Sequence, residues 1–335
     1  MECLDVVRCS AQRIKTLACL SISLALCGGS AWAQDTDPVA AYPDRPVRLV
    51  APFSAGGALD MIARSVAESW SKQFGQSFIV DNRAGAAGII GSTYVARSEP
   101  DGYTLLLGST TTHGINPSLY KTISYKPEDF TPVSLIATIP HVLVVNPNLG
   151  VNSLKDFLAY VKAHPGATFG SAGIGSPHHL VGEMLKTMTG LQMTHVPYKG
   201  SAPALSDLMG GQTTFVSVEY TAAAPYIASG KLKAIAIASA ERVPGIDVPT
   251  YKEQGLPLEV TAWYAIYAPA HTPPEIVEKL SKGVAAAVRE PELRKRLVAL
   301  GAQPVGNTPA EMAAFQKKEL ALWAKAIKDS GATAE

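Results

Sequence analysis

From Pro46 onward, short apolar runs rich in β-branched residues alternate with amphipathic helical patterns, and no other property of the sequence restricts the fold class as strongly. Val47–Ala51 (VRLVA) is typical of a buried strand, and a helical pattern with apolar residues at spacings of three and four follows from Leu59 to Trp70. Repeated strand–helix–strand units form mostly parallel sheets with helices on both faces. The sequence therefore predicts an α/β protein.

The alternation continues along the chain and predicts where further elements lie. We expect strands at 78–81, 104–108, 142–146, 168–170, 194–197, 214–218, 234–238 and 262–268. We expect helices at 88–97, 154–163, 180–189, 274–289 and 312–329, with a short one from Pro291. The pattern restarts after 142–146, and only helices follow 262–268, which indicates a chain that crosses twice between two lobes. The predicted domains are lobe 1 (43–144 and 263–335) and lobe 2 (145–262), each a mostly parallel sheet flanked by helices, with two crossovers at the hinge.

Residues 1–33 are predicted to be a signal peptide. A positively charged start precedes an apolar run from Leu17 to Cys27, which is shorter than the ~20 residues that a membrane-spanning helix needs. Ala31-Trp32-Ala33 then supplies the small residues of a cleavage site. Cleavage after Ala33 would export the chain to the periplasm. Lipoprotein processing at Cys27 is the second interpretation, although Leu26 is bulkier than that motif prefers.

Cysteine content and charge narrow the function further. All four cysteines precede Ala33, so the exported chain is predicted to have no disulfide, no thiol nucleophile and no cysteine metal site. The 29 Lys and Arg residues balance 28 Asp and Glu residues, whereas a nucleic-acid-binding protein carries a basic face. We therefore expect no nucleic-acid partner.

Common catalytic motifs are absent from the sequence. It contains no GxxxxGK[ST], no complete GxGxxG, no GxSxG and no HExxH. His178 and His179 are adjacent, and adjacent side chains on a helix point in different directions, which argues against joint metal binding. Ser176 with His179 is the one local pair that an exported hydrolase could use. We predict a protein without catalytic residues, metal or cofactor.

Small-residue loops between strands and helices are the candidate ligand sites. The first, Pro52–Asp60, brings glycine backbone groups and a helix start together, which suits an anion. The second, Gly170–Leu180, combines three glycines, two serines and a fixed helix start at Pro177. Hydroxyls also follow the strand at 104–108. Each loop has a purely structural interpretation too, as a tight turn whose side chains cap their own backbone.

The motifs together resemble the Bug/TctC family of extracytoplasmic solute-binding receptors, the soluble components of tripartite tricarboxylate transporters. The resemblance covers nearly all of the exported chain. Its carriers are Tyr42–Val47 (YPDRPV), Gly56–Asp60 (GGALD), Asn82–Gly88 (NRAGAAG), Pro100–Leu106 (PDGYTLL), Gly173–His179 (GIGSPHH) and Val196–Gly200 (VPYKG).

The resemblance implies a two-lobed periplasmic-binding-protein fold that closes on a small organic acid, for which a dicarboxylate and an aromatic acid are both open, and delivers it to membrane subunits of the transporter. We expect a monomer. A receptor read by a membrane sensor kinase is the alternative function. The predicted ligand-binding residues are Phe53, Ser54, Gly56, Gly57, Asp60, Ser109, Thr110, Ser171, Ala172, Gly175, Ser176, His179, Tyr198 and Glu219.

Two positions depart from the family pattern. Ala55 stands where the family usually has Pro, and Val218 stands where many relatives have Asp, with Glu219 adding a carboxylate beside it. Tyr198, Tyr220 and Trp263 are candidates to line the cleft. The identity of the organic acid is therefore left open by the sequence.

Overall fold

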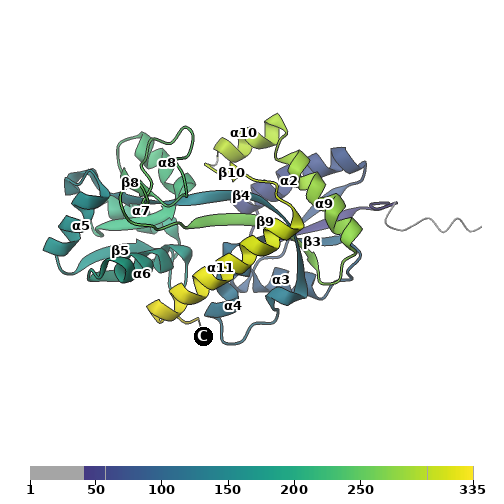
Figure 1. Ribbon diagram of the computed structural model, residues 1–335, viewed down its shortest axis with the longest axis horizontal. Coiled ribbons are helices and arrows are strands. Elements are labelled where there is room, and N and C mark those ends of the chain that lie inside the picture. Colours follow the sequence, from purple (N-terminus) through teal and green to yellow (C-terminus); the bar gives the residue numbers. More distant parts are fainter. Residues whose placement is uncertain (1–40, 57, 300, 335) are drawn as a thin grey trace, which may run out of the picture. The chain divides into compact units, whose positions relative to one another are not determined.

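The computed structural model of the protein describes residues 41–56, 58–299 and 301–334 (Figure 1). The predicted signal peptide and Gly57 lie outside these residues. The strands are β1 (Val47–Ala51), β2 (Phe78–Asn82), β3 (Thr104–Ser109), β4 (Phe130–Val145), β5 (Ala167–Ser171), β6 (Met193–Pro197), β7 (Phe215–Glu219), β8 (Lys233–Ile237), β9 (Thr261–Pro269) and β10 (Gln303–Pro304).

Helices surround these strands (Figure 1). They are α2 (Ala58–Phe74), α3 (Ile89–Ala96), α4 (Asn116–Leu119), α5 (Leu154–Ala163), α6 (Pro177–Thr189), α7 (Ser201–Met209), α8 (Tyr220–Ala228), α9 (Pro274–Ala287), α10 (Pro291–Ala299) and α11 (Pro309–Ser330). A six-residue π-helix, η2 (Thr110–Ile115), continues directly from β3.

The described strands form one connected sheet in the order β2-β1-β3-β9-β4-β7-β5-β6, with β8 and β10 each paired to β4. Neighbours at both ends of this order are parallel: β1 with β2 and β3, and β5 with β6 and β7. The two strands in the middle, β4 and β9, pair antiparallel with each other and with their other neighbours. The fold class predicted from the sequence, α/β with mostly parallel sheets flanked by helices, is confirmed.

Strand β4 links the two parallel parts of the sheet. Its first section, Phe130–Pro140, pairs with β9, and its second section, His141–Val145, pairs with β7 and β8. The sequence predicted only the end of this strand, at 142–146, because Pro132 and Pro140 interrupt the apolar run and proline normally argues against a central strand. Register shifts between β4 and β9 near Pro132 accommodate the irregularity.

Three of the α-helices, α4, α7 and α8, were not predicted. α4 has only four residues, α8 is rich in alanine and contains Pro225, and α7 contains Pro203 near its start. A predicted helix at 88–97 begins one residue later, at Ile89, because Gly88 has a left-handed backbone (φ 86°) and acts as its N-cap.

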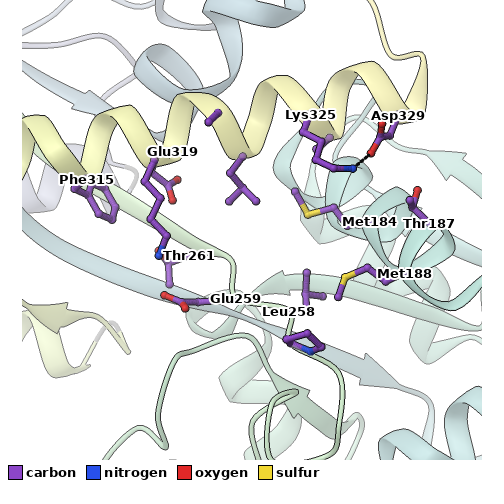
Figure 2. A pocket seen from close by; sticks show the side chains of 15 residues that line it. Met184, Thr187, Met188, Leu258, Glu259, Thr261, Phe315, Glu319, Lys325 and Asp329 are labelled. Carbon is purple, nitrogen blue, oxygen red and sulfur yellow. Dashed lines mark hydrogen bonds and ion pairs between the residues drawn. The ribbon is translucent and has the colours of Figure 1, made fainter.

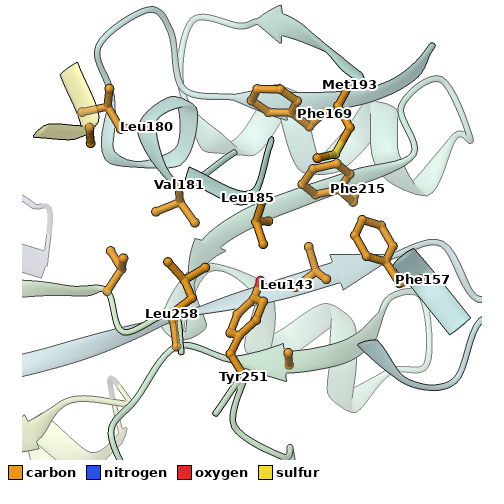
Figure 3. Close-up of a cluster of buried hydrophobic side chains, with 14 of the residues drawn as sticks. Leu143, Phe157, Phe169, Leu180, Val181, Leu185, Met193, Phe215, Tyr251 and Leu258 are labelled. Atoms are coloured by element: carbon orange, nitrogen blue, oxygen red, sulfur yellow. The ribbon is translucent and has the colours of Figure 1, made fainter. Parts of the chain in front are cut away.

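The buried core between α5, α6 and the sheet is built from aromatic and branched side chains (Figure 3). Phe215 packs edge-to-face with Phe157 at 5.0 Å between ring centres and stacks with Phe169 at 5.5 Å. Leu185 and Met193 pack in the same cluster. Truncating one of these rings to alanine costs about 3–5 kcal/mol, so this core holds β5, β7 and the start of α6 in place.

Candidate functional site

A cavity of about 260 Å³ lies where the π-helix η2, strand β9, the turn after β1 and the start of α6 meet. Five of the predicted ligand-binding residues line it: Phe53, Ser54, Ser109, Thr110 and Glu219. The other lining residues are Leu59, Thr111, Pro177, Ala262, Trp263 and Tyr264. Sequence segments more than a hundred residues apart therefore converge on one small cavity.

Hydroxyl groups form one side of this cavity. The Ser109 Oγ is buried and has no hydrogen-bond partner within the described part of the chain. The Thr110 Oγ1 accepts a hydrogen bond from the Trp263 backbone N–H at 2.8 Å, which leaves its own proton free to donate. The backbone N–H of Ser109 donates to Thr112 Oγ1 at 3.0 Å and so fixes the turn into η2. Ser109 and Thr110 thus present two donors at the end of a strand.

The first loop partly lines the cavity and partly supports its own turn. Phe53 and Ser54 reach the cavity. Asp60 is buried, and its carboxylate accepts hydrogen bonds from Gly56 N–H (2.9 Å), Arg64 (3.0 Å) and Asn82 (2.9 Å). Burial alone would raise the pKa of Asp60, but these hydrogen bonds, that of Arg64 foremost, lower it overall. Asp60 and Gly56 therefore hold the turn closed.

The second loop uses its donors internally. Ser171 Oγ donates to the Gly173 carbonyl (3.1 Å) and lies 2.6 Å from His195 Nε2. Ser176 is the N-cap of α6: its Oγ donates to the Gly173 carbonyl at 2.7 Å and accepts from the His179 backbone N–H at 3.3 Å. Of this loop and the start of α6, only Pro177 lines the cavity.

His179 supports the second loop. Its Nδ1 accepts a hydrogen bond from Gly175 N–H at 3.1 Å, and its ring stacks on His195 at 3.9 Å between centres. Burial lowers the pKa of both imidazoles to about 4. The Ser176 hydroxyl is directed at Gly173 and bonds only the backbone of His179, so the serine–histidine pair considered for a hydrolase does not form.

The remaining predicted residues are Ala172 and Gly175 of the second loop and Tyr198, which follows β6. Tyr198 donates its hydroxyl to Asp207 at 2.7 Å, and burial, followed by that hydrogen bond, raises the pKa of Tyr198 to about 12. Gly175 is buried with φ 75°, where a Cβ atom would lie 2.5 Å from Leu119 Cδ2. Ala172 is half-buried. These three residues do not line the cavity.

A carboxylate also lines the cavity. Glu219, the last residue of β7, places its Oε2 2.8 Å from His178 Nε2 and its Oε1 3.8 Å from His141 Nε2. His141 and Glu219 are register partners across the antiparallel β4–β7 pair. His178 and His179 point to different partners, as the sequence predicted for adjacent helical residues. Val218, by contrast, is fully buried in the core.

The electrostatics of this group follow from burial and pairing. Burial alone would raise the pKa of Glu219, but the charge and hydrogen bond of His178, with His141 adding to them, lower it well below its usual range. Burial lowers the pKa of His141 to about 4. Burial and the nearby Glu219 charge raise the pKa of Tyr264, so its hydroxyl keeps its proton. The Glu219 side of the cavity is therefore an ionised acceptor.

The sequence analysis did not include several of the residues that line the cavity among the predicted ligand-binding residues. Trp263 was a candidate to line the cleft, and it does. Its indole N–H donates to buried Glu319 of α11 at 2.8 Å, which fixes the ring. Tyr264 follows it on β9. The sequence did predict the apolar strand at 262–268 that carries Trp263 and Tyr264, but it does not indicate which residues of that strand reach the cavity.

A larger groove of about 570 Å³ lies between α6 and α11 and contains no predicted site residue. Met184 and Met188 of α6 face Phe315, Lys325 and the rest of α11 across it, and Lys325 pairs with Asp329 (Figure 2). Its lining is mostly apolar, as is that of the smaller cavity, but it offers no unpartnered buried hydroxyl among the described residues. The smaller cavity is the better candidate for a polar ligand.

Within residues 41–56, 58–299 and 301–334, no group of three or more His, Cys, Asp or Glu side chains is placed to hold a metal ion. No helix in the same ranges is long and apolar enough to cross a bilayer.

A converging set of loops around a small cavity with several polar groups, on a sheet crossed by two antiparallel strands, is the architecture of a periplasmic solute-binding protein. Comparison with known proteins agrees. The family model described as tripartite tricarboxylate transporter family receptor matches residues 62–332. The chain belongs to this family, which the sequence resemblance had indicated, and it is thereby placed among receptors and not among enzymes.

Individual relatives support the same assignment. The chain is 38% identical to the protein BugT of Bordetella pertussis over 325 residues, covering 95% of this chain and 98% of BugT. A Rhodopseudomonas palustris protein solved with adipate superposes with a TM-score of 0.75 at 40% identity, covering 87% of this chain and 99% of that one. MatC of the same organism, solved with bound malate, superposes with a TM-score of 0.70 at 35% identity, covering 85% of this chain and all (100%) of MatC.

Proposed function

We propose that this receptor binds a small organic acid in the 260 Å³ cavity and delivers it to the membrane subunits of a tripartite tricarboxylate transporter. The observation that carries the proposal is the buried Ser109 Oγ, which lines the cavity without a partner among the described residues. A buried hydroxyl without a partner costs free energy, and a ligand acceptor such as a carboxylate oxygen removes that cost.

The surroundings of Ser109 suit an anion. Thr110 and Ser54 add hydroxyls, and the first turns of α2 and α6, helices of 17 and 13 residues, line the cavity through Leu59 and Pro177. The N-terminal ends of helices carry partial positive charge. Two relatives of similar fold were solved with adipate and malate, both carboxylates.

Calorimetry of the exported protein with adipate and malate as probes tests this proposal. Ser109→Ala should weaken carboxylate binding by about 1.5–3 kcal/mol, the contribution of a hydrogen bond to a charged group, which corresponds to roughly 10- to 150-fold in Kd. Ser281→Ala is the control, because it removes a hydroxyl that is buried on α9 outside the cavity. Equal affinities in wild type and Ser109→Ala would contradict the proposal.

The proposed receptor acts as a monomer in the periplasm after cleavage at Ala33. Its proposed lobes are residues 43–144 with 263–335 and residues 145–262, which the β4 and β9 strands connect. The intact mass of protein recovered from the periplasm should correspond to a chain starting at Gln34. A lipid-modified chain that starts at Cys27 would overturn this processing scheme.

A further inference from the structure

The residues that β3 and β7 bring to the proposed carboxylate cavity differ in their hydrogen-bonding capacity. Ser109 and Thr110, at the end of β3, offer donors, whereas Glu219, at the end of β7, offers only acceptor oxygens. Strands β9 and β4 separate β3 from β7 in the sheet, so a ligand that fills the cavity meets the donors and the ionised carboxylate at different places along its length.

Glu219 is held in place by buried partners. His178, which is buried in the first turn of α6, hydrogen-bonds one carboxylate oxygen at 2.8 Å, and buried His141 lies 3.8 Å from the other. Its side chain is 22% exposed, so the carboxylate keeps one open face. Because His178 Nε2 is bonded to Glu219, that carboxylate cannot turn away from the cavity without leaving a buried histidine nitrogen unpaired.

Glu219 also occupies the place where the helix ends of the protein would otherwise stabilise a second carboxylate of the ligand. It precedes α8 and contacts the first turn of α6, so its own charge already occupies the positive ends of these helices. A second anion placed there would meet like charge in a partly buried site, where Coulomb repulsion is poorly screened. A hydroxyl or ammonium group would instead donate to the free face of Glu219.

We propose that this receptor selects acids that carry a carboxylate at one end and a hydrogen-bond donor, a hydroxyl or an ammonium group, at the other end, with Glu219 as the specificity-determining residue. This inference rests on the proposed function, since it assigns the carboxylate of the ligand to Ser109 and Thr110. It separates this chain from relatives solved with the diacids adipate and malate.

Calorimetry with ligands matched in length tests the selectivity. The six-carbon probes are adipate, hexanoate, 6-hydroxyhexanoate and 6-aminohexanoate, and the four-carbon probes are succinate, butyrate, 4-hydroxybutyrate and 4-aminobutyrate. In at least one series, the wild type should bind a donor-bearing acid at least tenfold more tightly than the diacid. A gain for both the hydroxy and amino acids indicates hydrogen bonding to Glu219, and a gain for the amino acid alone indicates charge pairing; both support the proposal.

Glu219→Gln supplies the matched variant. It should weaken binding of the donor-bearing acid at least tenfold and strengthen binding of the diacid, because the repulsive charge is gone. Glu259→Gln, which changes an exposed carboxylate outside the cavity, should leave every affinity unchanged. Thermal unfolding of each variant confirms that it is folded.

Three results would overturn the inference. The first is a wild type that binds the diacid as tightly as the donor-bearing acid in both series, which needs no variant to observe. The second is a Glu219→Gln variant that weakens all probes by one common factor, which is the mark of a structural role. The third is a wild type that binds none of these acids nor malate, which would refute the proposed function as well.

Discussion

The two glycine-rich loops have similar compositions and follow parallel strands, yet they do different work. The loop after β1 sends Phe53 and Ser54 into the cavity, and its one carboxylate, Asp60, holds the turn. The loop after β5 satisfies Ser171 and Ser176 within itself, and Ser171 also bonds the half-buried imidazole of His195. A hydroxyl near a helix start is thus a ligand donor only if the loop leaves it without a partner.

The largest expected effect is that of acid, which should lower the stability of the whole protein and open the second loop before the first. Burial lowers the pKa of His113 to about 3 and that of His141 to about 4, both below the value of 6.5 expected in the unfolded chain. The unfolded state therefore binds protons first, so stability is full above about pH 6.5 and falls as the pH drops toward 4. Each of these two imidazoles contributes about 1.4 kcal/mol per pH unit in that window.

Urea unfolding at pH 7.5 and 5 should consequently differ by about 4 kcal/mol from these two groups alone. Hydrogen exchange at pH 5 should show residues 171–179 losing protection before residues 53–56, because His179 and His195, with pKa values of about 4, lie only beside the second loop. A free energy of unfolding that stays constant between the two pH values would contradict this expectation.

Matched glycine substitutions compare the packing of the loops. Gly56 and Gly175 both have left-handed backbones, with φ 89° and 75°, so alanine costs about 1 kcal/mol at either position. A Cβ atom at Gly175 would also lie 2.5 Å from Leu119, whereas nothing lies within 4 Å of one at Gly56. Gly175→Ala should therefore lose about 2–4 kcal/mol of stability and Gly56→Ala about 1. If chemical denaturation gave equal losses of stability for the two variants, the second loop would be able to shift away from Leu119 at no cost, which would contradict this prediction.

Serine substitutions give the smallest effect and the sharpest contrast. Ser176→Ala should lower the free energy of unfolding by about 1 kcal/mol, because it removes the N-cap of α6. Its carboxylate affinity should change much less than that of Ser109→Ala, since the Ser176 hydroxyl is already bonded to Gly173. Denaturation and calorimetry on both variants measure the two quantities. A Ser176→Ala variant with intact stability and strongly reduced affinity would return the second loop to the ligand site.

Much of the fold could be predicted because its signals are local. The strand at Val47–Ala51 and the helix at Leu154–Ala163 match the structure residue for residue. Periodicity depends only on neighbours along the chain, so a clear apolar pattern is enough. The long β4 strand was missed because Pro132 and Pro140 carry the opposite local signal, and pairing with β9 overrides it.

The site was predicted less completely, because hydrogen-bond partners are not a local property. Ser109 and Ser176 look alike in the sequence, since both are hydroxyls at the start of a helical segment. Only the folded chain leaves Ser109 unpartnered among the described residues and pairs Ser176 with Gly173. The π-helix after β3, which presents Thr110 and Thr111, likewise has no distinct sequence signal.

The sequence by itself determined the fold class, the family and the small-residue loops near the ligand cavity, because these follow from periodicity and motifs along the chain. The tertiary structure alone decided that Ser109, Glu219 and Trp263 share one cavity and that His141 stands opposite Glu219. These residues are brought together by strand register and crossing strands, and such long-range pairing depends on the packing of the whole sheet.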